Sequence, residues 1–210
     1  FYTLKETQGN MYEGYTLVNE FQVPGENVNV RVTKNWVDTA DQKDKRPEKV
    51  TIVLKSNSVE VAEQRKEIAT EENTTVTFEN LPRYDSNGNA ITYTATEEGN
   101  NKFYTIESTT GNMTDGYVIT NKFKVPDEKV SVNVTKNWED TEEQKDKRPE
   151  KVTIVLKANT EEVADQRKEI STTENTTVTF ENLPKYDSNG DEIVYTATEE
   201  GNNKFYTVEE

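Results

Sequence analysis

Three polar residues lie on the apolar faces of predicted strands, where core side chains are expected. Successive side chains of a strand point to opposite sides, so Lys34 shares one face with Val30 and Val32. The same alternation places Glu97 and Asn121 on the apolar faces of two later runs. An amine, a carboxyl group and a carboxamide that all face inward predict an amide bond formed inside the core.

The chemistry of such a bond assigns a role to each residue. Burial penalises the charged ammonium, which lowers the pKa of Lys34 and favours the neutral, nucleophilic amine. Burial also disfavours a charged carboxylate, so Glu97 is expected to be protonated and to donate a hydrogen bond to the side-chain carbonyl of Asn121. Glu97 would be the catalytic acid, and the product is a Lys34–Asn121 isopeptide bond with loss of ammonia.

A plainer interpretation exists for each residue taken alone. A lysine near a strand end can extend to solvent, and an asparagine there often bonds to backbone. The complementary chemistry of three aligned residues favours the cross-link. Trp36 and Trp138 are interpreted as core residues rather than as a ligand platform.

The sequence repeats with an offset of about 102 residues, and the constellation repeats with it. Lys136 and Glu199 match the amine and the catalytic acid, and Asn19 matches the acceptor. The acceptor for Lys136 would lie beyond the end of the sequence. Lys136 and Asn19 are therefore predicted to be halves of incomplete or inter-repeat links, with Glu199 as the second catalytic residue.

Short alternating or β-branched runs separated by turn residues predict an all-β chain, most simply a β-sandwich. The predicted strands of the central repeat are Val28–Trp36, Val50–Lys55, Thr74–Phe78, Ile91–Glu97, Lys102–Glu107 and Tyr117–Phe123. The segment Val59–Ile68 fits either a helical turn or a polar strand. Asn-Gly turns are predicted at Asp85–Gly88 and at Asp187–Gly190.

Val23-Pro24 and Val125-Pro126 are the predicted domain boundaries. Residues 1–23 match only the last two strands of a repeat, residues 24–124 form a complete domain, and residues 125–210 lack the last strand. The first fragment thus supplies what the last one lacks. The expected partners are neighbouring repeats or identical chains, joined by strand complementation.

Composition excludes several classes of function. The chain has no cysteine and no histidine, which removes disulfides, thiolate metal sites and Ser-His or Cys-His catalysis. A net charge of −15 argues against nucleic acid and anionic membranes as partners. Only 31% of the residues are apolar, so each domain has a small core and is expected to need an additional cross-link for stability. No transmembrane segment or signal peptide is visible.

No cofactor and no metal are predicted. The acidic loop Asp38–Asp44 and the turns Asp85–Asn89 and Asp187–Asp191 carry enough oxygen ligands for a weak calcium site. The two turns lack the remaining spacing and the terminal glutamate of an EF-hand loop. They are interpreted as structural turns.

The motifs around these residues resemble Cna B-type domains, the B-region modules of Gram-positive collagen adhesins and pilins. The resemblance covers the whole repeat twice and rests on Lys34-Asn-Trp36, Asp38, Lys45-Arg-Pro47, Phe78-Glu-Asn-Leu-Pro82, Tyr84-Asp, Tyr93-Thr-Ala-Thr-Glu97 and Ile119-Thr-Asn121. It implies a prealbumin-like (Ig-like) β-sandwich used as a stalk, located outside the cell on the wall or a surface appendage. It also implies a spontaneous bond with Lys34 as amine, Asn121 as acceptor and Glu97 as acid.

The predicted function is a structural stalk or fibre repeat of a bacterial adhesin or pilus-like protein. The alternative is a module that binds a host matrix protein or glycan through loops or strand edges. A conventional enzyme is disfavoured, because self-cross-linking in a single turnover accounts for the candidate acids and amines.

Overall fold

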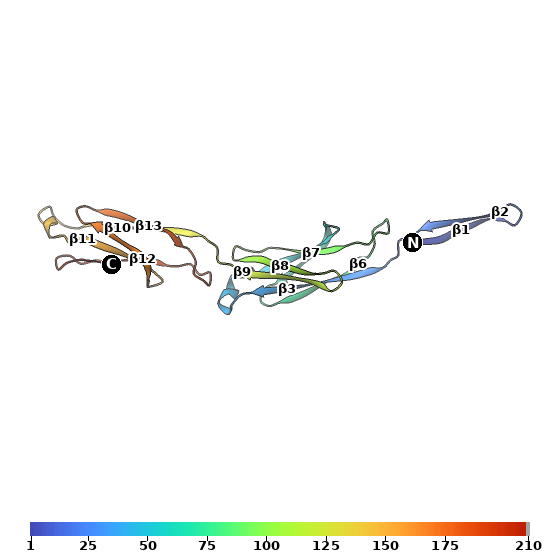
Figure 1. The fold of residues 1–210 in the computed structure, drawn as a ribbon, viewed down its shortest axis with the longest axis horizontal. Coiled ribbons are helices and arrows are strands. Elements are labelled where there is room, and N and C mark those ends of the chain that lie inside the picture. Colours follow the sequence, from blue (N-terminus) through green and yellow to red (C-terminus); the bar gives the residue numbers. More distant parts are fainter. Residues whose placement is uncertain (209–210) are drawn as a thin grey trace. The chain divides into compact units, whose positions relative to one another are not determined.

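A computed structural model describes residues 1–208 of the chain, which divides into two compact units, Phe1–Lys124 and Val125–Glu210. Each unit is built from short β-strands, as predicted (Figure 1). The described helices are two single 3₁₀ segments, η1 (Ala40–Lys45) and η2 (Lys145–Lys147). Neither they nor any other described segment forms a helix long and apolar enough to cross a membrane.

The first unit contains a β-sandwich. A four-stranded sheet with the order β6-β3-β9-β8 packs on a three-stranded sheet with the order β5-β4-β7. The strands are β3 (Asn27–Val37), β4 (Lys49–Ser56), β5 (Val59–Ala69), β6 (Thr74–Pro82), β7 (Tyr93–Glu98), β8 (Tyr104–Asn112) and β9 (Gly116–Phe123). All six predicted strands of the central repeat are present, and the segment left open between helix and strand is β5.

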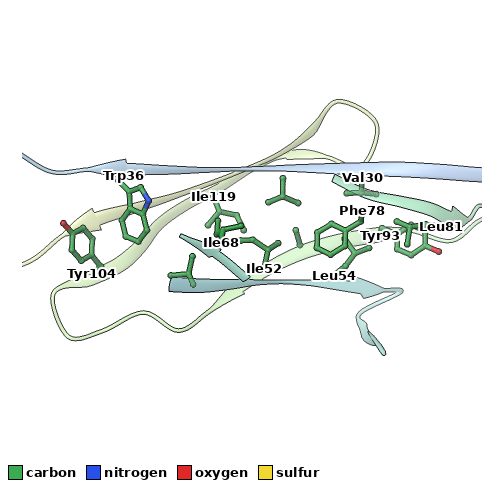
Figure 2. Close-up of a cluster of buried hydrophobic side chains, with 13 residues drawn as sticks. Val30, Trp36, Ile52, Leu54, Ile68, Phe78, Leu81, Tyr93, Tyr104 and Ile119 are labelled. Atoms are coloured by element: carbon green, nitrogen blue, oxygen red, sulfur yellow. The ribbon is translucent and has the colours of Figure 1, made fainter. Parts of the chain in front are cut away.

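Side chains from both sheets meet in one core, which follows the predicted alternation. Val30 and Val32 of β3 are fully buried, and they pack with Phe78, Leu54 and the other core side chains of Figure 2. Trp36 and Trp138 each lie in a hydrophobic core with only 8% exposure, as predicted. Apolar faces of this kind supply most of the favourable free energy of folding.

The first and last strands of the sandwich lie side by side. β3 and β9 are parallel neighbours, with Lys34 opposite Ile119 and Trp36 opposite Asn121. Residues opposite each other in a ladder point to the same face of the sheet. Lys34 and Asn121 therefore enter the core from adjacent strands, two positions apart in the ladder.

The first unit also contains a separate two-stranded hairpin, β1 (Tyr2–Asn10) paired with β2 (Gly14–Phe21). Its register matches that of the β8–β9 hairpin, including the irregularity after Leu4 that recurs after Ile106. The tight turns match as well. A side chain at Gly9 or Gly111 would collide with the carbonyl oxygen of the glycine across the turn, so both positions require glycine.

The second unit repeats only the first five strands of the sandwich. β10 (Lys129–Lys136) pairs with β13 (Thr176–Pro184), and β11 (Lys151–Ala158) lies between β12 (Glu161–Ser171) and β14 (Tyr195–Glu200). Among residues 125–208, no strand corresponds to β8 or β9. As a result Val132 and Val134 are only half-buried, whereas their counterparts in β3 are fully buried.

Candidate cross-linking site

Lys34 and Glu97 form an ion pair inside the first sandwich. The Lys34 Nζ atom lies 3.4 Å from Glu97 Oε2, and the two side chains are 1% and 0% exposed. The same Nζ donates a hydrogen bond of 3.0 Å to the backbone carbonyl of Asn35. The pair joins the two sheets, because Lys34 comes from β3 and Glu97 from β7.

Asn121 reaches the same ion pair from β9. Its Nδ2 atom donates hydrogen bonds of 2.6 Å to Glu97 Oε1 and of 2.6 Å to Asn100 Oδ1. The structure thus brings together the three residues that alternation singled out. All three residues are buried.

Asn100 is a member of the site that the sequence prediction missed. Its Nδ2 donates a hydrogen bond of 2.9 Å to Glu97 Oε1, and its Oδ1 accepts one from Asn121. One amide therefore orients both the carboxylate of Glu97 and the amide of Asn121. Asn100 lies in the loop after β7, where strand alternation says nothing about direction. One signal was available, since Asn202 repeats Asn100 at the offset of 102 residues.

The hydrogen bond between Glu97 and Asn121 differs from the predicted one. An acid at Glu97 was expected to donate to the amide oxygen, but here the amide nitrogen donates to the carboxylate. An ionised carboxylate paired with an ammonium can only accept, which selects this orientation of the amide. The consequence is that the buried Asn121 Oδ1 has no hydrogen-bond partner.

The electrostatic setting of the amine agrees with the prediction for Lys34. Burial lowers the pKa of Lys34 to about 8, although the negative charge of Glu97 acts in the opposite direction. The ammonium also lies over the ring of Trp36, 4.2 Å from the centroid. Burial thus favours the neutral amine, the form that the predicted attack on Asn121 requires.

A polar cluster closes the core beside this ring. Arg46 binds both carboxylate oxygens of Asp38, at 2.7 and 2.8 Å, and donates 2.7 Å to the carbonyl of Thr70. The Tyr104 hydroxyl donates to Asp38 at 2.7 Å, and its ring meets Trp36 edge-on. Burial opposes ionisation of Asp38, but the hydrogen bonds from Arg46 and Tyr104 keep the pKa of Asp38 below its usual value.

The second unit contains the same site without the acceptor. Lys136 Nζ lies 3.1 Å from Glu199 Oε2, and Asn202 donates 2.5 Å to Glu199 Oε1. Lys136 also lies 4.2 Å from the centroid of the Trp138 ring. The Lys136 and Glu199 side chains are 14% and 6% exposed, more than in the first unit. Asn19, the matching amide in the sequence, is exposed on β2.

A cleft of about 780 Å³ lies beside β10 in the second unit. Its walls include Val134 and Lys136 of β10, Ile154 of β11, and Ala197 and Glu199 of β14. Within the described residues, β10 pairs with β13 alone, so its other edge borders this cleft. In the first unit the corresponding edge of β3 pairs with β9.

The turn at Asp85–Asn89, one of the oxygen-rich segments, is held together by its own hydrogen bonds. Asp85 uses its carboxylate within the turn, where it accepts from the backbone of Asn87 and Asn89 and from the Asn89 side chain. Among residues 1–208, no three acidic side chains gather as a metal site.

Comparison with known proteins adds to this geometry. The chain matches the family described as Cna protein B-type domain, over residues 30–122 and again over residues 132–210. The chain belongs to this family. Cna B-type domains are structural repeats, and one of the relatives that carry them is an adhesin.

Individual relatives of these Cna B-type domains come from Staphylococcus aureus. A collagen adhesin is 34% identical over 204 residues, which is 95% of this chain but only 16% of that protein. The crystal structure of two B repeat units of the collagen-binding protein is 33% identical, with a TM-score of 0.47, and covers 92% of this chain and 48% of that one. A single B repeat unit is also 33% identical, with a TM-score of 0.38, and covers 83% of this chain and 86% of that one.

Proposed function

We propose that the chain is a stalk or fibre repeat of a bacterial cell-surface adhesin or pilus-like protein, stiffened by autocatalytic Lys–Asn isopeptide bonds. The observation that carries this proposal is the buried cluster of Lys34, Glu97 and Asn121. Membership of the Cna B-type family supports the spacer role and a location outside the cell, on the wall or an appendage.

The domain assignment is part of the proposal. Residues 1–23 are the C-terminal strands of a preceding repeat, residues 24–124 are a complete Cna B-type domain, and residues 125–210 are a domain without its last strand. The identical registers of the β1–β2 and β8–β9 hairpins support this assignment. Neighbouring repeats or identical chains are the partners that complete the outer parts.

The reaction begins with proton transfer inside the ion pair. The proton of the Lys34 ammonium moves to Glu97, which leaves a neutral amine and a carboxylic acid. The Asn121 amide then turns its oxygen toward this acid, which gives the unpartnered Oδ1 a hydrogen-bond donor. Low exposure keeps water away and strengthens the polarisation of the carbonyl.

The bond forms by attack of Lys34 Nζ on Asn121 Cγ. As the new C–N bond forms and the bond to Nδ2 breaks, one amine hydrogen is transferred through Glu97 to the leaving group. Ammonia departs, and the proton count on Glu97 is restored. Glu97 is the catalytic residue in this scheme, and Asn100 is a positioning residue that orients both the acid and the amide.

The position of the link explains what it would do for a stalk. It would connect the first and last strands of the sandwich and enclose a loop of 87 residues. Restricting a loop of this size in the unfolded chain contributes about 4–5 kcal/mol if disulfide loop entropy applies to this link. Only 31% of the residues of the chain are apolar, so the core is small. The link would offset the low stability expected of such a core.

The test is the intact mass of the purified chain, combined with peptide mapping. The expected result is the loss of one ammonia and a branched peptide that joins Lys34 to Asn121. Glu97→Ala is expected to have the mass calculated from its sequence, with no ammonia lost. The matched control Glu98→Ala changes an exposed neighbour and is expected to lose one ammonia, as the wild-type chain does. A wild-type chain of unchanged mass would contradict the proposal.

The name of the S. aureus relative refers to collagen, and a host matrix protein is the alternative partner for this chain. A spacer predicts no binding of the 24–124 domain to immobilised matrix proteins. Saturable binding by that domain would favour the binding-module alternative.

A further inference from the structure

Two buried cations contact the ring of Trp36 in the first sandwich. Lys34 Nζ lies 4.2 Å from the ring centroid, and the guanidinium carbon of Arg46 lies 5.1 Å from it. Lys34 is the amine of the proposed reaction, whereas Arg46 is not one of the reacting residues. The face of an aromatic ring attracts a cation, so this ring helps to determine where both charges lie.

The orientation of the Trp36 ring depends on packing rather than on a hydrogen bond of its own. Its indole N–H is buried and has no hydrogen-bond partner. Tyr104 meets the ring edge-on, with 5.0 Å between the ring centroids, and the two rings lie together at one end of the core (Figure 2). The side chains that pack on the ring therefore hold it in place, and Arg46 is one of them.

Arg46 is itself fixed by four side-chain hydrogen bonds. Two go to the carboxylate of Asp38, at 2.7 and 2.8 Å, and two go to the carbonyl oxygens of Thr70 and Glu71, at 2.7 and 2.9 Å. The Arg46 and Asp38 side chains are only 7% and 2% exposed. A planar guanidinium bound in this way has one orientation, which the single ammonium of a lysine could not reproduce.

The backbone also restricts Arg46. Its N–H donates a hydrogen bond of 3.1 Å to the carbonyl of Lys43 at the end of η1, and its own backbone is extended. Pro47 follows directly, and a residue before proline is disfavoured in the helical conformation. The sequence Arg-Pro thus ends the 3₁₀ segment at the residue whose side chain packs on Trp36.

The second unit contains the same arrangement. Lys136 and Arg148 lie 4.2 and 5.1 Å from the centroid of the Trp138 ring. Arg148 binds both carboxylate oxygens of Asp140, each at 2.6 Å. The arrangement is therefore a property of the repeat and not of one loop.

Arg46 also places a permanent positive charge near the amine, because a guanidinium is not deprotonated in proteins. Burial is the main cause of the lowered pKa of Lys34, and the charge of Arg46 acts in the same direction, against that of Glu97. Asp38 offsets part of the charge of Arg46. The electrostatic contribution of Arg46 is therefore smaller than that of burial.

We propose that Arg46 is a positioning residue for the cross-linking reaction, an inference that rests on the proposed function. Arg46 holds the Trp36 ring, and the ring directs the amine of Lys34. Trp36 lies opposite Asn121 in the β3–β9 ladder, so the ring and the acceptor amide are neighbours on one face of the sheet.

The fixed ring matters most after proton transfer. The neutral amine of Lys34 no longer has the attraction of a cation for the ring, so it is free to turn away from it. A ring held by Arg46 remains as a wall on one side of Nζ and limits the directions that the amine can take. Such restriction keeps the amine close to the geometry needed for attack on Asn121.

The first test is Arg46→Lys in the full-length chain, which keeps the positive charge but not the planar set of donors. Ammonia loss at Lys34 and Asn121 is followed by mass after unlinked chain is diluted from denaturant, under conditions in which the denaturation curve shows the variant to be folded. The rate is expected to fall by about tenfold, because small errors in alignment are costly. The pH at which the rate falls in alkaline solution is expected to stay unchanged.

The double variant Asp38→Asn/Arg46→Met removes the charges together, so that no buried carboxylate is left without its partner. It is the variant expected to fold if Arg46→Lys does not. The rate is again expected to fall, and the alkaline decrease is expected to move to higher pH. Removal of a nearby positive charge raises the pKa of Lys34, so the amine and Glu97 keep their shared proton to a higher pH.

The groups that face the amine and its ring are Glu97 of β7, Tyr104 of β8 and the Arg46–Asp38 pair. The double variant changes the pair and leaves Glu97 and Tyr104 in place. A purely structural role of Arg46 would not move the pH profile in this direction.

Thr70→Val is the matched control for loss of stability in the same loop. The Thr70 hydroxyl donates to the carbonyl of Pro47, next to Arg46, and valine removes this bond while it nearly keeps the shape. The variant is expected to unfold at a lower denaturant concentration but to react with the wild-type rate and pH profile.

Two results would overturn the positioning role and leave the proposed function intact. One is equal slowing of Arg46→Lys and Thr70→Val, and the other is a wild-type rate and pH profile in both Arg46 variants, while the wild-type chain loses ammonia through Lys34 and Asn121. A wild-type chain of unchanged mass would instead overturn the proposed function, and this inference with it.

Discussion

At the scale of single residues, the site depends on one proton shared by an ion pair. Lys34 and Glu97 are both buried, so neither side chain can exchange protons freely with water. The reaction needs a neutral amine and a carboxylic acid together, a combination that the ion pair reaches by internal proton transfer. In the structure Lys34 lies beside Glu97, and the amide nitrogen of Asn121 faces the carboxylate.

The rate of bond formation is therefore expected to have a bell-shaped dependence on pH. Burial lowers the pKa of Lys34 to about 8, so as the pH rises through about 8 the pair loses its proton and Glu97 can no longer act as an acid. At low pH the amine of Lys34 stays charged and cannot attack. The rate can be followed by mass after dilution of unfolded, unlinked chain from denaturant. A rate that continues to rise in alkaline solution would contradict the role of Glu97.

Asn100→Ala is expected to slow the reaction by about tenfold to a hundredfold, because small errors in alignment are costly. Asn101→Ala is the matched control, since Asn101 donates to the carbonyl of Lys45 and touches neither reacting group. If Asn100 had only a structural role, both variants would have a lower unfolding midpoint and would lose ammonia at equal rates. That outcome would contradict the positioning role of Asn100.

At the scale of strands, alternation explains why so much of the sandwich was predictable. Val30, Val32, Lys34 and Trp36 share a face because a strand allows only two directions for a side chain. The pairing of β3 with β9 was not predictable in this way, because it joins residues far apart in the sequence. Asn100 was missed for a related reason, as a loop has no fixed period. The β5 segment is polar on both faces for much of its length, so its pattern did not distinguish strand from helical turn.

The link between β3 and β9 is expected to stabilise the first sandwich by about 4–5 kcal/mol. The double variant Lys34→Met/Glu97→Gln removes the bond and both buried charges while it nearly conserves side-chain volume. Its free energy of unfolding, measured by denaturant titration of residues 24–124, is expected to be lower than that of the linked protein by this amount. Equal midpoints for the two proteins would show that the bond serves something other than stability.

At the scale of the whole molecule, the two units differ in how far they bury their matching strands. The second lacks counterparts of β8 and β9 among its described residues, and its β10 valines are only half-buried. In dilute solution the amides of residues 125–208 are expected to exchange with solvent faster than those of residues 24–124, because local opening exposes less apolar surface. Hydrogen exchange with mass detection would show this. Equal protection of the two regions in a confirmed monomer would contradict this expectation.

A link between the parallel neighbours β3 and β9 would also limit how far such a repeat can extend when its ends are pulled apart. Without a bond, residues 24–124 would stretch to a contour length of about 350 Å. With Lys34 joined to Asn121, only the short segments outside the ring lie on the path of the force, and the contour length falls to about 50 Å. A tether made of such repeats would lengthen little under load, and a cell attached through it would stay at nearly constant distance from its anchor.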